Sequence, residues 1–225
     1  MFYKAIKKAI EWKDYLAEPN KHWRTGYSAK ELAYCWQNQK ADFPDIVNQA
    51  FIKNGIQAKF LLGIPEYKVP MPGTGKDSQN DIFVLARINS NLCPIVVEGK
   101  CNEPFGKYCD DKSLDEPNRN KRYLSMLNEL SLNTEKILPE KLRYQLLHRT
   151  LSAIRIAKDF DASTCMMIIH RIGASKEGSF NDYRFYLSLF NIAAEKETVQ
   201  AVCINDIKVL FLWIEDQNSY SEGKE

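Results

Sequence analysis

The sequence predicts an α/β fold in which helices cover a mixed β-sheet. Three observations indicate it. Apolar, β-branched stretches alternate with segments of helical periodicity along the chain. Residues 142–160 carry one continuous apolar stripe at helical spacing. Residues 80–100 have the pattern of a β-hairpin, because apolar arms at 82–86 and 95–97 flank the turn-forming Asn89-Ser90-Asn91. We therefore expect one sheet built around this hairpin.

Local signals justify the elements in chain order. Residues 1–18 repeat apolar side chains near helical spacing, and Pro19 ends that pattern. Ser28 and Glu31 have the spacing of a capping box for the next helix, and Pro44 stands near the start of a third helix. The apolar stripe of the first helix is Phe2, Ile6, Ile10 and Leu16. Strands are expected over 58–64, 165–170 and 209–214, with a loop over 67–78. Later helices are expected over 118–132, 142–160 and 180–190.

Length and composition suit a single domain. The 225 residues divide into a helical part (1–56), an α/β core (57–216) and a flexible tail (217–225). No apolar run is long enough to cross a membrane, and the N-terminus lacks the apolar region of a secretory signal. Six cysteines without paired spacing favour reduced thiols and a cytoplasmic protein.

The charged ends of the hairpin are the candidate functional site. If Asn89-Ser90 is a two-residue loop, Asp81 falls opposite Glu98, and their carboxylates come close enough to share one cation. Side chains alternate along a strand, so Lys100 points to the same side as Glu98. The ordinary alternative is that both acids are solvated strand ends.

The spacing acid-x-Lys is not specific by itself. It occurs six times in the chain, starting at Glu11, Glu66, Glu98, Asp110, Asp206 and Glu222. Only the match at Glu98 closes an apolar strand whose preceding neighbour begins with another acid.

This order of acid, two apolar strands and Glu-x-Lys resembles the PD-(D/E)xK nuclease superfamily, which has the restriction-endonuclease-like fold. Residues 26–36, 78–87 with 97–106, and 143–153 are similar to an uncharacterised bacterial family within it, a domain of unknown function. One departure is that Asn80 stands where the superfamily has proline. The acid that follows is retained, and only the acid can bind a metal ion.

The resemblance implies a Mg²⁺- or Mn²⁺-dependent endonuclease. Asp81, Glu98 and the backbone carbonyl of Gly99 would hold the metal ion, and Lys100 would orient or deprotonate the attacking water or neutralise charge on the phosphorane. The resemblance further implies that a helix after the Glu-x-Lys strand offers polar groups to the phosphate, and Gln145 and Arg149 are the candidates. The implied partner is nucleic acid, with DNA favoured over RNA and no membrane, and enzymes that cut both strands commonly form homodimers.

The sequence also allows other roles for several of these residues and for the protein as a whole. Glu31 or Glu103 would complete the metal site, although a helix cap and a surface position explain them equally. Gln145 and Arg149 would otherwise lie on an exposed helix face, and His148 is expected to be half-buried and hydrogen-bonded. The protein would alternatively be an inactive nucleic-acid-binding or protein-interaction module on the same fold, or an enzyme that handles phosphoryl groups of small molecules. Residues 73–76 do not form a phosphate-binding loop, because a strand rather than a helix is expected after them.

Overall fold

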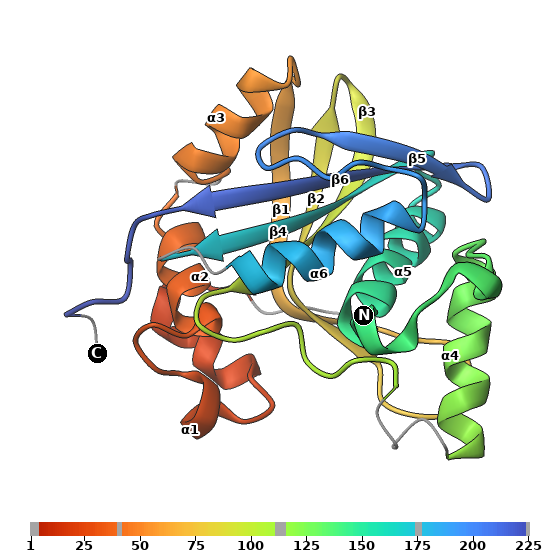
Figure 1. The fold of residues 1–225 in the computed structure, drawn as a ribbon. Coiled ribbons are helices and arrows are strands. Elements are labelled where there is room, and N and C mark those ends of the chain that lie inside the picture. The colour runs from red at the N-terminus through yellow and green to blue at the C-terminus, as the bar shows by residue number, and fades with distance from the viewer. Residues whose placement is uncertain (1–4, 40–41, 111–115, 174–176, 224–225) are drawn as a thin grey trace.

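A hairpin of β2 (Ser78–Ile88) and β3 (Asn91–Lys100) lies at the centre of the protein (Figure 1). The structure is a computed structural model that describes residues 5–39, 42–110, 116–173 and 177–223. Ile88 lies opposite Asn91, as the two-residue loop requires. Asn89 and Ser90 have φ values of 48° and 73°, and two positive φ values in succession match the hairpin turn that follows the twist of its strands. The predicted turn and register are confirmed.

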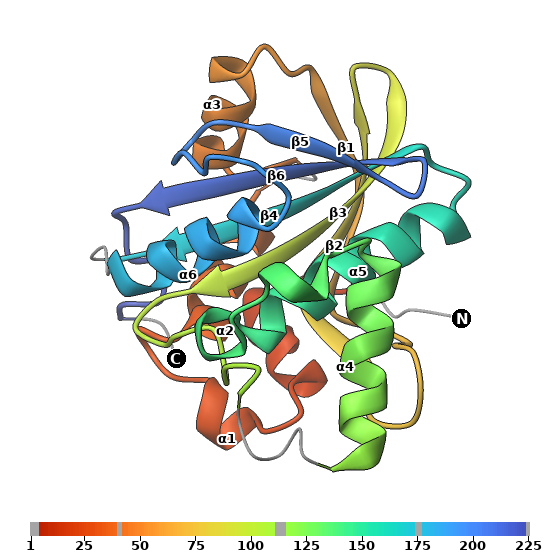
Figure 2. The ribbon, with the colours of Figure 1, turned by 45° about the vertical axis from the view of Figure 1, so that its right-hand side comes forward.

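The sheet has six strands in the order β1-β2-β3-β4-β6-β5 (Figure 2). The hairpin continues on one side into β1 (Ala58–Val69) and on the other into β4 (Thr164–Ile172), β6 (Ile207–Asp216) and β5 (Gln200–Ile204). The pairs β3–β4 and β4–β6 are parallel, and the remaining pairs are antiparallel. The predicted mixed sheet in an α/β fold is thus confirmed.

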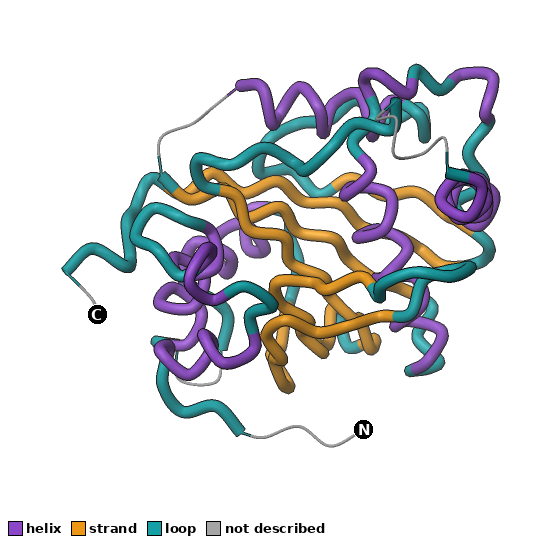
Figure 3. Tube along the Cα trace, turned by 90° about the horizontal axis from the view of Figure 1, so that it is seen from below, coloured by secondary structure: helices purple, strands orange, loops and turns teal. Residues whose placement is uncertain are grey.

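Helices cover both faces of the sheet, and each face has its own apolar core (Figure 3). One face packs against α4 (Pro117–Glu129), α5 (Tyr144–Asp159) and α6 (Glu177–Ser188). The other packs against η1 (Ala9–Tyr15), α2 (Ser28–Gln37) and α3 (Asp45–Lys53). The helices η1, α2 and α3 of the N-terminal part therefore contribute to the core of the sheet. The remaining short elements are α1 (Pro19–His22), η3 (Thr134–Lys136) and η4 (Pro139–Lys141).

Helix α5 contacts the four central strands and β1. Its predicted apolar stripe of Leu147, Leu151 and Ile154 is buried against the sheet. Each such side chain contributes about 1.5–3 kcal/mol when it leaves water. This packing fixes the N-terminal half of α5 beside the start of β2 and the end of β3.

The N-terminal helix differs from the prediction. Of the described residues before Pro19, only Ala9–Tyr15 are helical, and they form a 3₁₀-helix, in which residues three apart lie above one another. Ala9 and Trp12 are consequently the buried pair, whereas Ile10 keeps 41% of its surface exposed. Phe2, which belonged to the predicted stripe, lies outside the described residues.

Strand β1 is longer than predicted, and β5 was missed. Tyr67, Lys68 and Val69 pair with the start of β2, so the expected loop over 67–78 begins only after Val69. Strand β5 is short and half-exposed, which gives it little apolar signal of its own. Both segments take strand structure from their neighbours in the sheet.

The C-terminal tail is held by Glu31. The Glu31 carboxylate accepts hydrogen bonds from the backbone N–H groups of Tyr220 (2.6 Å), Ser221 (3.1 Å) and Gly26 (3.1 Å). Ser221 is fully buried, so the expectation of a flexible tail over 217–225 is wrong as far as this residue. The predicted capping role of Ser28 is also wrong, because Ser28 is the first residue of α2 and Tyr27 occupies the N-cap position.

Candidate functional site

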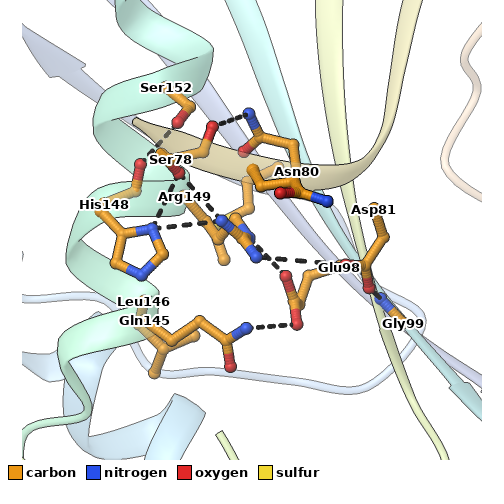
Figure 4. Close-up of polar contacts among 12 residues, drawn as sticks. Ser78, Asn80, Asp81, Glu98, Gly99, Gln145, Leu146, His148, Arg149 and Ser152 are labelled. Carbon is orange, nitrogen blue, oxygen red and sulfur yellow. Dashed lines mark hydrogen bonds and ion pairs between the residues drawn. The ribbon is translucent and has the colours of Figure 1, made fainter. Parts of the chain in front are cut away.

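Asp81 and Glu98 lie together on the α5 face of the hairpin, both beside Arg149 (Figure 4). Lys100 pairs with Glu98 on the same face. Phe83 and Val96 belong to the core on that face. Asp81 lies two residues before Phe83 and Glu98 two residues after Val96, so strand alternation places both acids on the same face. The Asp81 Oδ2 atom accepts a 2.8 Å hydrogen bond from the backbone N–H of Gly99. The alternative of solvated strand ends is excluded for Glu98, which is 1% exposed.

Three donors already satisfy the Glu98 carboxylate. Its Oε1 accepts from Lys100 Nζ and, at 2.7 Å, from the Gln145 side-chain amide. Its Oε2 accepts from Arg149 Nε. Burial acts to raise the pKa of Glu98, but the charges of Arg149 and Lys100 outweigh it and hold that pKa below its usual value. Glu98 is therefore an ionised anchor for two buried cations.

Glu66 on β1 joins this site, although sequence reasoning passed over it. Because Pro65 pairs with Ile82 and Tyr67 with Asn80, the register sets Glu66 beside Asp81. Burial and then the Asp81 charge raise the pKa of Glu66 to about 8. One sequence feature could have identified Glu66 as a site residue, because it is the only acid in the β1 sequence.

Asp81 is perturbed in the same direction. Burial and then the Glu98 charge raise its pKa to about 7, although Arg149 and Lys100 oppose the increase. We call Glu66, Asp81 and Glu98 the acid cluster. Its three carboxyl groups exceed the two cations beside it, and burial together with the repulsion between the carboxylates lets Glu66 and Asp81 keep their protons to a higher pH than usual.

The acid cluster fits a hard divalent cation. The Oδ1 atom of Asp81 lies 4.0 Å from Arg149 and makes no hydrogen bond within the described residues. Glu66 uses one oxygen to accept a 2.6 Å bond from the Gln79 amide. Two carboxylates with unused oxygens, in a site short of positive charge, are the donor set that Mg²⁺ or Mn²⁺ prefers. Glu98, whose oxygens already accept three hydrogen bonds, has less capacity left for a metal ion than these two acids.

Gly99 has a structural reason to be glycine. A Cβ atom there would lie 2.3 Å from Leu32 Cδ1 on α2, on the opposite face of the sheet from α5. The N–H of Gly99 points toward Asp81, and in a strand the carbonyl of the same residue points toward the same neighbouring strand. The predicted metal role of this carbonyl remains compatible with that direction.

Helix α5 supplies the predicted phosphate-directed groups, Gln145 and Arg149. Arg149 is 5% exposed, which excludes the exposed-face alternative for it. Its Nη1 atom also donates to Ser78 Oγ (2.9 Å) and contacts His148 Nδ1 (3.2 Å). Burial and then the Arg149 charge hold the pKa of His148 well below its usual value, so His148 is neutral, half-buried and hydrogen-bonded as predicted.

The two other acids considered for the metal site, Glu31 and Glu103, accept hydrogen bonds in another part of the structure. Glu31 holds the C-terminal tail, as described above. Glu103 accepts the Ser28 N–H at the start of α2 (3.1 Å). Both carboxylates accept hydrogen bonds near the N-terminal end of α2, and these bonds do not involve the acid cluster.

A second group of possible ligands lies under α2. Cys35, His170 and Asp216 are buried with their ligand atoms within 4.8 Å of one another. The Trp36 indole, which can only donate, binds His170 Nδ1 at 3.1 Å, so His170 Nε2 carries the proton shared with Asp216 at 3.2 Å. Burial raises the pKa of the Cys35 thiol. With both imidazole nitrogens used and the thiol protonated, this group is structural.

Fold and site together define an α/β protein with a partly buried cluster of three carboxyl groups and two cations at the open end of its central hairpin. The chain belongs to the family described as a domain of unknown function (DUF6946), whose model matches residues 5–218. No curated protein and no solved structure matches it. Within the described residues, no helix has both the length and the apolar character needed to cross a bilayer.

Proposed function

We propose that the protein is a metal-dependent nuclease that hydrolyses phosphodiester bonds of nucleic acid, with DNA favoured over RNA. One observation carries the proposal: two carboxyl groups with unused oxygens, Glu66 and Asp81, lie beside a buried lysine and arginine on one face of the sheet. A purely structural site would pair each acid with a cation. A site for a metal ion and a phosphate needs both carboxylates that hold the metal ion and basic side chains that hold the phosphate. A cytoplasmic location and a homodimer belong to the same proposal.

Each side chain has a role in this chemistry. Asp81 and Glu66 would hold Mg²⁺ or Mn²⁺, with the Gly99 carbonyl and Glu98 completing the set. When bound, such an ion polarises a phosphate and lowers the pKa of water. Lys100 orients the water or stabilises the developing negative charge. Arg149 and Gln145, released from Glu98, donate to the phosphate oxygens.

Cleavage assays with purified variants test this function. Single- and double-stranded DNA and RNA are incubated with Mn²⁺ or with EDTA. The wild-type protein should cleave at least one of them with Mn²⁺ only, and Asp81→Ala and Lys100→Ala should abolish cleavage while the proteins stay folded. Arg87→Gln, an exposed change at the other end of β2, is the matched control. Undiminished cleavage by the Asp81 and Lys100 variants would contradict the proposal.

A non-catalytic binding module is the second candidate, and the state of Glu98 favours it. The ion pair of Glu98 with Arg149 ties β3 to α5 without any metal ion, and Lys100 on β3 pairs with the same carboxylate. A module of this kind would gain no thermal stability from Mg²⁺ or Mn²⁺ and would bind nucleic acid without cleaving it. The nuclease should gain stability from either ion, because the ion neutralises the acid cluster.

A further inference from the structure

A cleft of about 640 Å³ opens beside the acid cluster. The residues before and at the start of β2 form one wall, and α4, α5 and the segment around Tyr108 form the others. Gln145 and Arg149 line the cleft and also bind Glu98, so the two sites are continuous. Whatever occupies the cleft is therefore adjacent to the proposed reaction centre.

The lining of the cleft is strongly basic. The whole chain has a net charge of only +2. Within the cleft, five lysines and arginines face one aspartate: Lys76, Lys107, Arg119, Arg122, Arg149 and Asp77. Glu98 pairs with Arg149 and Glu116 with Arg119, and the five cations still outnumber these two acids and Asp77. This concentration of charge selects an anionic ligand.

Arg122 is built into the cleft by the glycine-containing segment 73–76. A Cβ atom at Gly75 would lie 2.6 Å from the Arg122 Nη1 atom, and Gly75 has a φ of +134°, so only glycine allows this approach. Arg122 is 9% exposed, and its Nη2 donates to the Lys76 carbonyl at 2.7 Å. Its Nε is buried and has no acceptor within the described residues. A buried, unpaired donor on a fixed guanidinium is a position for a phosphate oxygen.

Aromatic rings complete the lining. Tyr144 and His148 stand with ring centroids 5.5 Å apart, and Tyr108 lies under the Arg143 guanidinium at 3.5 Å. Positive charge combined with aromatic rings is the usual composition of a site for unpaired nucleotides. A volume of this size holds one small molecule or one nucleotide, whereas a double helix does not fit within it.

We propose that the cleft binds one unpaired nucleotide of a nucleic-acid strand, with a phosphate on Arg122, so that single-stranded substrate is presented to the acid cluster. This inference rests on the proposed function and names its substrate class. Arg122 is a binding residue here, and the segment 73–76 holds its guanidinium in place.

Binding is measured without metal, so that it is independent of cleavage. Fluorescence anisotropy in EDTA follows a labelled single-stranded oligonucleotide with a 5′-phosphate, and a duplex of the same sequence serves for comparison. We expect the single strand to bind more tightly than the duplex. Arg122→Gln should weaken its binding about tenfold or more, because a charge-assisted hydrogen bond is lost. The slope of log affinity against log salt should fall by about 0.7, which corresponds to one lost phosphate contact on a single strand.

Two further variants keep the test decisive. Arg119→Gln changes a more exposed cation of the cleft and should also lower the salt slope. It serves as the test if the Arg122→Gln variant does not fold. Arg87→Gln removes the same charge outside the cleft and should change neither quantity. Equal affinity for the duplex, no single-strand binding, or unchanged salt slopes in both cleft variants would overturn the inference. If the protein cleaves nucleic acid but the cleft variants bind the single strand as the wild type does, only the nucleotide site in the cleft is refuted. If the cleft binds the single strand but nothing is cleaved in Mn²⁺, only the nuclease activity is refuted.

Discussion

Replacing Asp81 by asparagine should stabilise the protein at alkaline pH, although it removes a proposed metal ligand. The pKa of Asp81 is raised from its usual 3.8 to about 7. A folded pKa above the unfolded value contributes stability that is present below about pH 4 and is lost as the pH rises through about 7. The difference between the two pKa values corresponds to about 4 kcal/mol at 1.36 kcal/mol per pH unit. Since the Asp81 side chain keeps 20% exposure to solvent, we expect about half of this, about 2 kcal/mol.

Thermal denaturation without metal at pH 5 and pH 8 measures the effect. For a chain of this length, about 2 kcal/mol raises the Tm by roughly 4–8 °C. The Asp81→Asn variant should show this gain over the wild type at pH 8 and much less of it at pH 5, because its amide oxygen still accepts the Gly99 N–H. Asp159→Asn changes an exposed acid on α5 and should show no such pH dependence. An Asp81→Asn variant that loses stability equally at both pH values would refute the reasoning.

Three further substitutions or truncations test how the site is held. Glu98→Gln should cost about 3–5 kcal/mol in urea denaturation, because it leaves two buried cations without their shared anion. Gly99→Ala should cost about 1–3 kcal/mol through its clash with Leu32, and Leu32→Ala in the same chain should recover part of that loss. Deleting residues 217–225 should cost about 1–3 kcal/mol, since the buried carboxylate of Glu31 loses three donors.

Each result has a clear contrary outcome. A Glu98→Gln loss below about 1 kcal/mol would show that the cations have other partners in solution. Strictly additive losses from the Gly99 and Leu32 changes in a double-mutant cycle would show that these residues are not in contact. A truncated chain as stable as the full chain would show that the tail does not pair with Glu31.

The hairpin was predictable because its determinants are local. Asn89 and Ser90 tolerate positive φ, the arms are apolar and β-branched, and strand alternation then sets Asp81 and Glu98 on one side. The groups on α5 were predictable for a similar reason, since helical spacing separates the polar positions 145 and 149 from the apolar stripe.

The rest of the site depends on contacts between distant segments. Glu66 joins the acid cluster only through the pairing of β1 with β2, and nothing near it in the sequence specifies that register. Arg122 reaches the cleft because the segment 73–76 folds over it, which depends on the packing of α4 beside that segment. Glu31 resembled a helix cap in sequence, but most of its donors come from the far end of the chain.

Calorimetric titration of Mn²⁺ into the protein near pH 7, in two buffers with different ionisation enthalpies, tests the central claim most directly. Asp81 and Glu66 have pKa values of about 7 and 8, so a cation that binds them must displace protons. We predict saturable binding with proton release to the buffer in the wild type, and loss of both in Asp81→Asn. Absence of Mn²⁺ binding in the wild type, or equal binding in the variant, would contradict a metal site at the acid cluster.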